Sequence, residues 1–489
     1  MESMIEQLVE VLWGWPLTYG LLAVGAYLTF GSGFWQIRHF TYAMKKGWVM
    51  MTGKGDEDDK KGIMSSGKAL AIAMGSAVGV GNIGGVGSAV SLGGPGVMFW
   101  LWITAILGMM TKMAEVVLAV HYRDVRPDGS TFGGPTFYIE KCLGKQRGWK
   151  SWKLFAGLFG ISLFSTYFLE PETFSVAETF NSLFGWNLIT CGWIYAILVW
   201  IVVLGGLKKI GAFAGRVVPF MALFYMGAGI IILLKDASNI PTTFGLIFKH
   251  AFTPTAAIGG FAGSMLLATI RIGVSRSLWS NEAGWGTSPM AHATSKVSDP
   301  ITQGMYGILE VFVDTFLVCS ITGLVIINTG VWQSGLEGAS ITLKAFEIGI
   351  GKWGAIVVGV SLFLFAWSTS AGWFTYYNTL LEHAFRDNVS LRKKIIKMAA
   401  LCYSIPGISM VYFSVYYEIG ANYVWLITDI TTSLPTYVNL FAIVMASPTF
   451  FKCLKRYNSE NFGEKLDSVD RIEWFYEDAL TGKGGIDDD

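Results

Sequence analysis

Residues 77–96 combine a high glycine content with a single side-chain amide. Eight of these twenty residues are glycine, and Asn82 follows Gly79, Val80 and Gly81. Each glycine disfavours a helix interior by about 1 kcal/mol relative to alanine, so this run predicts local unwinding. Backbone N–H groups freed at a half-helix end carry partial positive charge and suit a carboxylate. These four residues are therefore predicted to bind a carboxylate, with close helix packing through small residues as the alternative.

Two adjacent hydroxyls, Ser368 and Thr369, lie within an otherwise apolar stretch, FAWSTSAGW at 365–373. Sodium is a hard cation that prefers oxygen ligands, and polar groups inside membrane segments are often functional. The pair is therefore a candidate sodium site. The alternative is that each hydroxyl donates to the helix carbonyl one turn earlier.

Two carboxylates, Glu170 and Glu172, flank Pro171 inside a fourth apolar segment. Charged groups at membrane depth are costly, which marks them as functional candidates. Glu172 is predicted to hold an amine on a bound molecule or to take up a proton. An internal ion pair with Arg271 remains the structural alternative.

The chain as a whole reads as an all-α membrane protein. Only 15% of its residues are charged and 52% are apolar, whereas a soluble domain carries about 25% charged residues. A membrane-crossing helix needs about 20 mostly apolar residues. Eleven segments meet this description: 16–37, 66–92, 96–122, 152–180, 187–209, 214–235, 256–276, 303–329, 352–384, 394–416 and 421–447.

Lysine and arginine concentrate in alternate loops between these segments. The loops 38–65 and 123–151 hold six each. Because cytoplasmic loops carry the excess of basic residues, the N-terminus is predicted to lie outside and the C-terminus in the cytoplasm. This makes the chain a multi-pass protein of the plasma membrane.

Ten of the eleven segments divide into two sets of five that enter the membrane from opposite sides. This is the parity of an inverted repeat, in which the first helix of each set is often broken. The first break is predicted at the glycine run. The second is predicted within 259–273, followed by the turn at 280–284.

Four ordered motifs carry a family resemblance. They are GNIGGVGSAVSLGGPGVMFWLW (81–102), TKMAEVVLAVHYR (111–123), GGP (133–135) and SNEAGWGTSPMAHA (280–293). Together they resemble the alanine or glycine:cation symporter family, over roughly residues 15–450. The resemblance implies a leucine-transporter-type fold preceded by one extra helix, and sodium-coupled uptake of a small neutral amino acid.

The apolar segments also predict the domains. We expect a transmembrane transporter domain over 1–450, with an extra helix at 16–37, a first repeat at 66–235 and a second at 256–447. A polar cytoplasmic tail would follow over 451–489.

The resemblance also assigns site residues. Carbonyls of Gly75 and Val78 would complete the sodium site, and Ile272 and Gly273 would line the substrate site beside Glu172. Family members usually carry Gln at the position of Glu172, so this residue departs from the family pattern. Proton coupling or a substrate of altered charge is therefore the alternative function.

Other function classes find little support in the sequence. The net charge of +1 and the five scattered cysteines argue against a nucleic-acid partner and a metal or redox motif. No nucleophile has an evident base, so an enzyme is not expected. Paired broken helices favour a transporter over a channel. The expected partners are a small amino acid and the lipid bilayer, with sodium as coupling ion and no organic cofactor; nothing indicates an oligomeric state.

Overall fold

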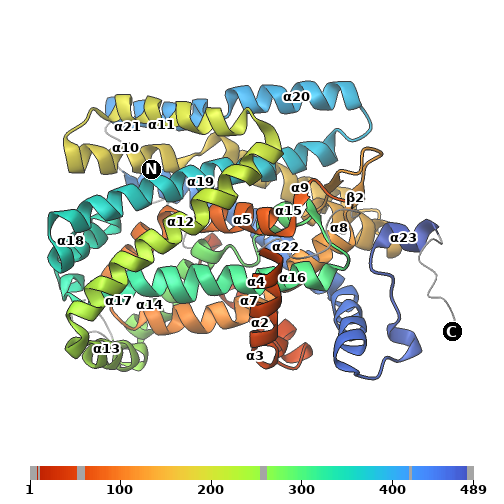
Figure 1. Ribbon diagram of the computed structural model, residues 1–489, viewed down its shortest axis with the longest axis horizontal. Coiled ribbons are helices and arrows are strands. Elements are labelled where there is room, and N and C mark those ends of the chain that lie inside the picture. The colour runs from red at the N-terminus through yellow and green to blue at the C-terminus, as the bar shows by residue number, and fades with distance from the viewer. Residues whose placement is uncertain (1–7, 9–10, 52–60, 254–261, 418–420, 482–489) are drawn as a thin grey trace.

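The computed structural model is built almost entirely of helices (Figure 1). It describes residues 8, 11–51, 61–253, 262–417 and 421–481. The helices and helical turns up to residue 235 are α2 Trp15–Gly31, α3 Trp35–Arg38, α4 Phe40–Met51, α5 Ser66–Ala77, η1 Gly81–Gly85, α6 Val86–Gly93, α7 Val97–His121, α8 Pro135–Tyr138, η2 Ile139–Gln146, α9 Trp152–Ser165, η3 Thr166–Phe168, α10 Pro171–Phe184, α11 Leu188–Val203 and α12 Gly206–Lys235.

The remaining helices follow the same pattern of long helices joined by short turns. They are η4 Ala237–Asn239, α13 Ile240–Phe252, α14 Ala262–Asn281, α15 Ser288–His292, α16 Pro300–Val311, η5 Phe312–Cys319, α17 Ser320–Asn328, η6 Val331–Gln333, α18 Gly338–Ile350, α19 Lys352–Ala384, α20 Val389–Cys402, α21 Ile405–Tyr417, α22 Ala421–Phe462, η7 Ser468–Asp470 and α23 Tyr476–Thr481.

Two short strand pairs complete the secondary structure of the described residues. Strand β1 (Met64–Ser65) pairs in parallel with β4 (Ser295–Lys296), and β2 (Asp124–Val125) pairs antiparallel with β3 (Thr131–Phe132). The parallel pair ties the start of α5 to the chain just after α15.

Each of the eleven predicted segments is mostly helical where the structure describes it, but some cross a turn between two helices: 187–209 includes the turn between α11 and α12, and 394–416 the turn between α20 and α21. By length and apolar composition, seven helices of the described residues can cross a membrane, or eight if the bent pair Ser66–Ala77 and Gly81–Gly93 is one span. A multi-pass helical membrane protein is thus confirmed, whereas the count of eleven and the two five-helix repeats stay predictions. Residues 254–261, at the start of one predicted segment, lie outside the described residues.

The segment predicted at 152–180 is two helices rather than one. The chain leaves η3 at Phe168, and α10 begins at Pro171. Proline is well suited to the first turn of a helix, since its missing N–H would have no partner there. Pro171 therefore starts a new helix and places Glu170 at its N-cap position.

Helix packing separates two groups that meet at α5 and α19. Helix α7 packs against α14 and α16, while α10 packs against α11 and α21. Helix α5 packs against both α12 and α19. In Figure 1 the helices α10, α11, α20 and α21 form one layer, and α7, α14 and α16 lie on the opposite side of α5 and α19.

Candidate functional site

The first predicted break is confirmed at the glycine run. Helix α5 ends at Ala77, the π-helical turn η1 begins at Gly81, and the two helical pieces are bent by 47°. Gly79 N donates to Asn82 Oδ1 at 2.8 Å. In a continuous helix this N–H would pair with the carbonyl of Gly75. The break therefore releases the Gly75 carbonyl from the helix ladder.

The released carbonyl of Gly75 faces the two hydroxyls of α19. Ser368 Oγ donates to Gly75 O at 3.0 Å, and Thr369 Oγ1 donates to it at 3.1 Å. A Cβ on Gly75 would lie 2.7 Å from Val218 Cγ2 and 3.3 Å from Ser368 Cβ. Glycine is thus required for this close approach. Three oxygens that the sequence singled out converge at one point.

The Ser368 hydroxyl has more than one possible acceptor. Ser368 Oγ also lies 2.9 Å from Phe365 O in its own helix, the backbone bond expected as the alternative. A hydroxyl offers one donor and two acceptor lone pairs. Donation to Phe365 would leave the Ser368 lone pairs free for a cation. Val78 caps α5, and its N–H donates to Met74 O.

Asn82 lies in a fully buried polar cluster. Its Nδ2 donates to Ser280 Oγ at 2.7 Å and to Asp314 Oδ1 at 2.6 Å, and Cys319 Sγ lies 3.2 Å away. Ser280 Oγ donates to the second oxygen of Asp314 at 2.7 Å. The amide of Asn82 thus bridges Gly79 and the η5 turn. A carboxylate ligand at residues 79–82 stays a prediction.

The second break lies after Asn281, not within the predicted range 259–273. Helix α14 runs unbroken from residue 262 to Asn281, so the described part of the predicted 259–273 break is helical. The chain leaves the helix at Glu282, whose φ of 54° is left-handed. Gly284 and Gly286, with φ of 93° and 78°, continue the turn before α15. Only the second half of the prediction, the turn at 280–284, is confirmed.

Glu115 of α7 holds the second break. Its two carboxylate oxygens accept from Gly284 N at 3.1 Å and Gly286 N at 2.9 Å, and Asn439 Nδ2 also donates to it. Non-helical backbone at membrane depth needs partners inside the protein. The carboxylate supplies them, so Glu115 positions the broken segment.

Ile272 and Gly273 lie away from the first break. A Cβ on Gly273 would approach Trp100 Cβ at 2.7 Å and Val97 O at 2.8 Å, which places this residue against the start of α7. Ile272 contacts the glycine that ends α6, Gly93. The α14 residue next to Gly81 is Trp279. A role for Ile272 and Gly273 at the substrate site stays a prediction, and their contacts are those of helix packing.

Glu170 and Glu172 line a cavity of about 40 Å³ beside α19, together with Trp279, Ser370 and Trp373. Ser370 Oγ donates to Glu170 Oε1 at 2.6 Å, while Glu170 Oε2 has no hydrogen-bond partner among the described residues. Arg271 has an interaction of its own, and its ion pair with these carboxylates stays the structural alternative. The volume holds only a few water-sized groups.

A cluster of charged and polar side chains surrounds Glu310, four residues before Asp314. Lys112 Nζ lies 3.3 Å from Glu310 Oε1 and 2.8 Å from Ser288 Oγ, and His292 Nε2 lies 3.2 Å from Glu310 Oε2. All of these side chains are buried. The cluster joins α7, α15 and α16 through charged groups.

The sequence did not place Ser280, Asp314, Glu115 and Cys319 at the site. A signal existed for the two carboxylates, since acidic residues in apolar segments are rare and functional. The hydrogen-bond partners lie far away in sequence and gave no local signal. In the described residues, no group of three or more His, Cys, Asp or Glu side chains could hold a metal.

The sequence of this chain is similar to those of known transporters. The model of the sodium:alanine symporter family matches residues 1–471. The chain is 37% identical to the sodium/alanine symporter AgcS of Methanococcus maripaludis, over 78% of this chain and 83% of that protein. It is 32% identical to the probable sodium/glutamine symporter GlnT of Bacillus subtilis, over 100% of this chain and 96% of that protein.

A solved structure supports the fold. The transporter MhsT in complex with L-phenylalanine covers 83% of this chain, and the chain covers 91% of MhsT, with a TM-score of 0.53 and 17% identity. At this identity the likeness concerns the fold alone. The relatives are transporters, and the family match extends over both breaks and the Ser368–Thr369 pair. The chain therefore belongs to the sodium:alanine symporter family.

Proposed function

We propose that the protein is a sodium-coupled symporter that takes up a small neutral amino acid of the alanine or glycine class across the plasma membrane. The observation that carries this proposal is the convergence of Gly75 O, Ser368 Oγ and Thr369 Oγ1 at the end of a broken helix. These are oxygen ligands of the kind a hard cation prefers. The Val78 carbonyl would be the fourth.

The substrate carboxylate would bind at the start of η1, at Gly79, Val80, Gly81 and Asn82. Backbone N–H groups at a helix N-terminus attract negative charge. Sodium beside Gly75 would add a positive charge one helical turn away. This arrangement gives ion and substrate a reason to bind together, because each charge lowers the cost of burying the other.

The topology that serves this function has eleven spans, two inverted five-helix repeats and an extra first helix. The two breaks occur in α5–η1 and in α14–α15, the first helix of each proposed repeat. Paired broken helices at corresponding positions are typical of secondary transporters. The N-terminus would lie outside and the C-terminus in the cytoplasm.

Glu172 supports a second candidate: proton coupling, or a substrate that carries an additional positive charge. The two carboxylates at Glu170 and Glu172 share one small cavity with Trp279 and Trp373. A carboxylate in such a cavity can accept a proton or an amine.

Uptake into proteoliposomes separates the two candidates. Labelled alanine, glycine, glutamine and lysine are offered with an inward sodium gradient, with potassium in its place, and with a pH gradient alone. We expect alanine or glycine uptake that requires sodium. Uptake driven by the pH gradient without sodium, or a preference for lysine, would favour the second candidate and reject the first.

A further inference from the structure

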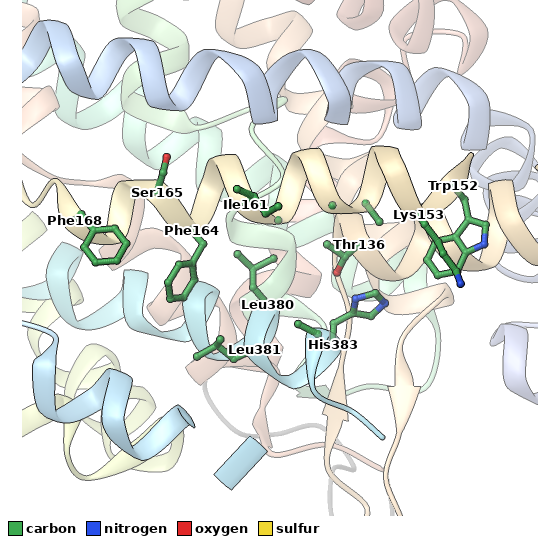
Figure 2. A pocket seen from close by; sticks show the side chains of 14 residues that line it. Thr136, Trp152, Lys153, Ile161, Phe164, Ser165, Phe168, Leu380, Leu381 and His383 are labelled. Carbon is green, nitrogen blue, oxygen red and sulfur yellow. The ribbon is translucent and has the colours of Figure 1, made fainter. Parts of the chain in front are cut away.

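A large hollow in the described part of the chain lies away from both breaks. It is a groove of about 500 Å³ between α9 and the end of α19, lined also by Thr136 of α8 (Figure 2). Ligand pockets in proteins have volumes of about 300–1,000 Å³. Neither the family nor the proposed transport site accounts for this groove.

The groove is apolar along most of its length. Ile161, Phe164 and Phe168 line it from α9 and η3, and Leu380 and Leu381 line it from α19. Ile161 is 76% exposed. The helix α9 is part of a candidate membrane span, Trp152–Phe184, of which only 28% is buried. This surface therefore faces lipid rather than protein or water.

Polar groups gather at one end of the groove. Figure 2 shows Trp152 and Lys153 at the end opposite Phe168, with His383 and Thr136 near them. The preceding turn adds the exposed basic residues Arg147 and Lys150, and Lys145, whose Nζ lies 3.5 Å from Glu140 Oε1. Tryptophan and lysine at the end of a span are typical of the membrane–water interface.

The acidic side chains Glu140 and Glu382, which lie beside this end, both form ion pairs with arginines. Glu140 accepts from Arg386 at 2.6 and 2.8 Å and faces His383 Nε2 at 2.9 Å. Lys153, in contrast, has no ion pair in the described part of the chain, and its Nζ lies 5.9 Å from the centre of the Trp152 ring. The end of the groove therefore carries a net positive charge that a phosphate can complement.

The length of the groove suits an acyl chain. Residues 152–168 rise by roughly 24 Å at 1.5 Å per residue. One leaflet of the hydrocarbon core is about 15 Å thick. An acyl chain that starts beside Lys153 can therefore lie in the groove along its full depth in one leaflet.

We propose that this groove binds one anionic phospholipid, with its phosphate at Lys153 and one acyl chain along α9 against Leu380 and Leu381. The site lies at the edge that the basic loops predict to be cytoplasmic. Its wall includes the last turns of α19, the helix that carries Ser368 and Thr369. The lipid would thus contact a helix of the transport site without touching the site.

Two kinds of variant test the binding separately. A Cβ on Gly157 meets nothing within 4 Å, and a Cβ on Gly160 meets only Thr136 Cγ2 at 3.8 Å. Both positions have room for a Cβ, so Gly157→Leu with Gly160→Leu places two apolar side chains in the groove, and leucine is a better helix former than glycine. Lys153→Ala removes the charge and leaves the groove open.

Matched controls lie on α12. A Cβ on Gly227 also meets nothing within 4 Å, and Lys208 is exposed at the start of the same helix. Gly227→Leu and Lys208→Ala repeat the two kinds of change away from the groove. Thermal melting of every variant reports folding.

Native mass spectrometry of the full chain in detergent measures retention of palmitoyl-oleoyl phosphatidylglycerol and of phosphatidylcholine with the same chains. We expect wild type to retain one phosphatidylglycerol and much less phosphatidylcholine. The filled groove should retain neither, and Lys153→Ala should weaken phosphatidylglycerol alone, about fivefold. Both α12 controls should match wild type.

Three results would overturn the proposal. Equal retention of the two lipids by wild type would remove the role of charge. Unchanged phosphatidylglycerol retention in the folded Gly157→Leu, Gly160→Leu protein would place the lipid elsewhere. A wild-type dimer that this variant abolishes would show that the groove is a contact between two copies of the chain.

Discussion

Thr369→Val tests the sodium site most directly. Valine keeps the branched shape of threonine and removes the hydroxyl, whose oxygen lies 3.1 Å from Gly75 O. The Gly75 carbonyl still receives the hydroxyl of Ser368 at 3.0 Å. The substitution therefore removes one proposed ion ligand without leaving the buried carbonyl unpaired.

The magnitudes for folding and for sodium differ. Loss of a hydrogen bond between neutral groups costs about 0.5–1.5 kcal/mol, whereas interactions with a charged partner contribute about 1.5–3 kcal/mol. The larger value corresponds to a factor of about ten to a hundred in affinity. We therefore expect the half-saturating sodium concentration for uptake to rise at least tenfold, with a small decrease in melting temperature.

The control is Thr379→Val in the same helix. Thr379 is buried, and its hydroxyl donates to Thr375 O at 2.8 Å, nearly three turns beyond the pair. The substitution Thr379→Val therefore removes an equivalent hydroxyl far from Gly75. Sodium titrations of uptake in proteoliposomes compare both variants with wild type. An unchanged half-saturating concentration in Thr369→Val, or an equal shift in Thr379→Val, would refute the assignment.

Three further substitutions have distinct outcomes. Asn82→Leu should abolish amino-acid binding by calorimetry and lower the melting temperature, because Oδ1 of Asp314 loses its donor at a cost of about 1–3 kcal/mol; normal binding would remove Asn82 from the site. Glu172→Gln should shift the uptake panel toward alanine or glycine if the wild type prefers another substrate, and an unchanged panel with unchanged pH dependence would leave Glu172 without a role in selectivity. For Glu140, burial raises the pKa, but hydrogen bonds from His383 and Arg386 outweigh it and hold the pKa below its ordinary value of 4.5. The melting-temperature advantage of wild type over Glu140→Gln should therefore be constant above about pH 5 and shrink as the pH falls below it; a constant difference down to about pH 3 would contradict this.

The first break could be predicted from the sequence because its cause is local. Glycine weakens a helix wherever it occurs, and eight glycines in twenty residues outweigh the surrounding apolar residues. The Ser368–Thr369 pair could also be predicted from the sequence, because two adjacent hydroxyls stand out in an apolar stretch. The structure adds that both hydroxyls meet the carbonyl that the break releases.

The second break was misplaced because glycine has two uses in membrane helices. Gly273 permits a close approach of α14 to Val97 and Trp100, which is packing rather than unwinding. The actual break is set by left-handed residues, Glu282 and two glycines. One of them is not glycine, and composition alone does not reveal it.

Hydrogen-bond and ion-pair partners that are distant in the chain could not be predicted from the sequence. Lys112 and Glu115 are three residues apart and face the same side of a helix. Lys112 nevertheless pairs with Glu310, and Glu115 accepts from the backbone of the second break. Tertiary packing decides between such partners, because many acidic residues are compatible with one buried lysine.

A buried carboxylate accepts hydrogen bonds at each of the two breaks and keeps the broken segment ordered. Asp314 accepts from Asn82 at the first break and from Ser280 beside the second, and Glu115 accepts from Gly284 and Gly286. Hydrogen bonds to a carboxylate are roughly twice as strong as those between neutral groups. The broken segments are thus held firmly to α7 and to the η5 turn that follows α16.

Helix α19 is joined to α5 in a weaker way. Its Ser368 and Thr369 hydroxyls donate to the Gly75 carbonyl, and these are bonds between neutral groups. If the two helix groups move relative to one another, this boundary costs less to open than the carboxylate contacts of the breaks. The proposed sodium ligands lie on both sides of the boundary. An ion bound there would hold the two sides together, and its release would let them separate, which gives sodium coupling a structural basis in this chain.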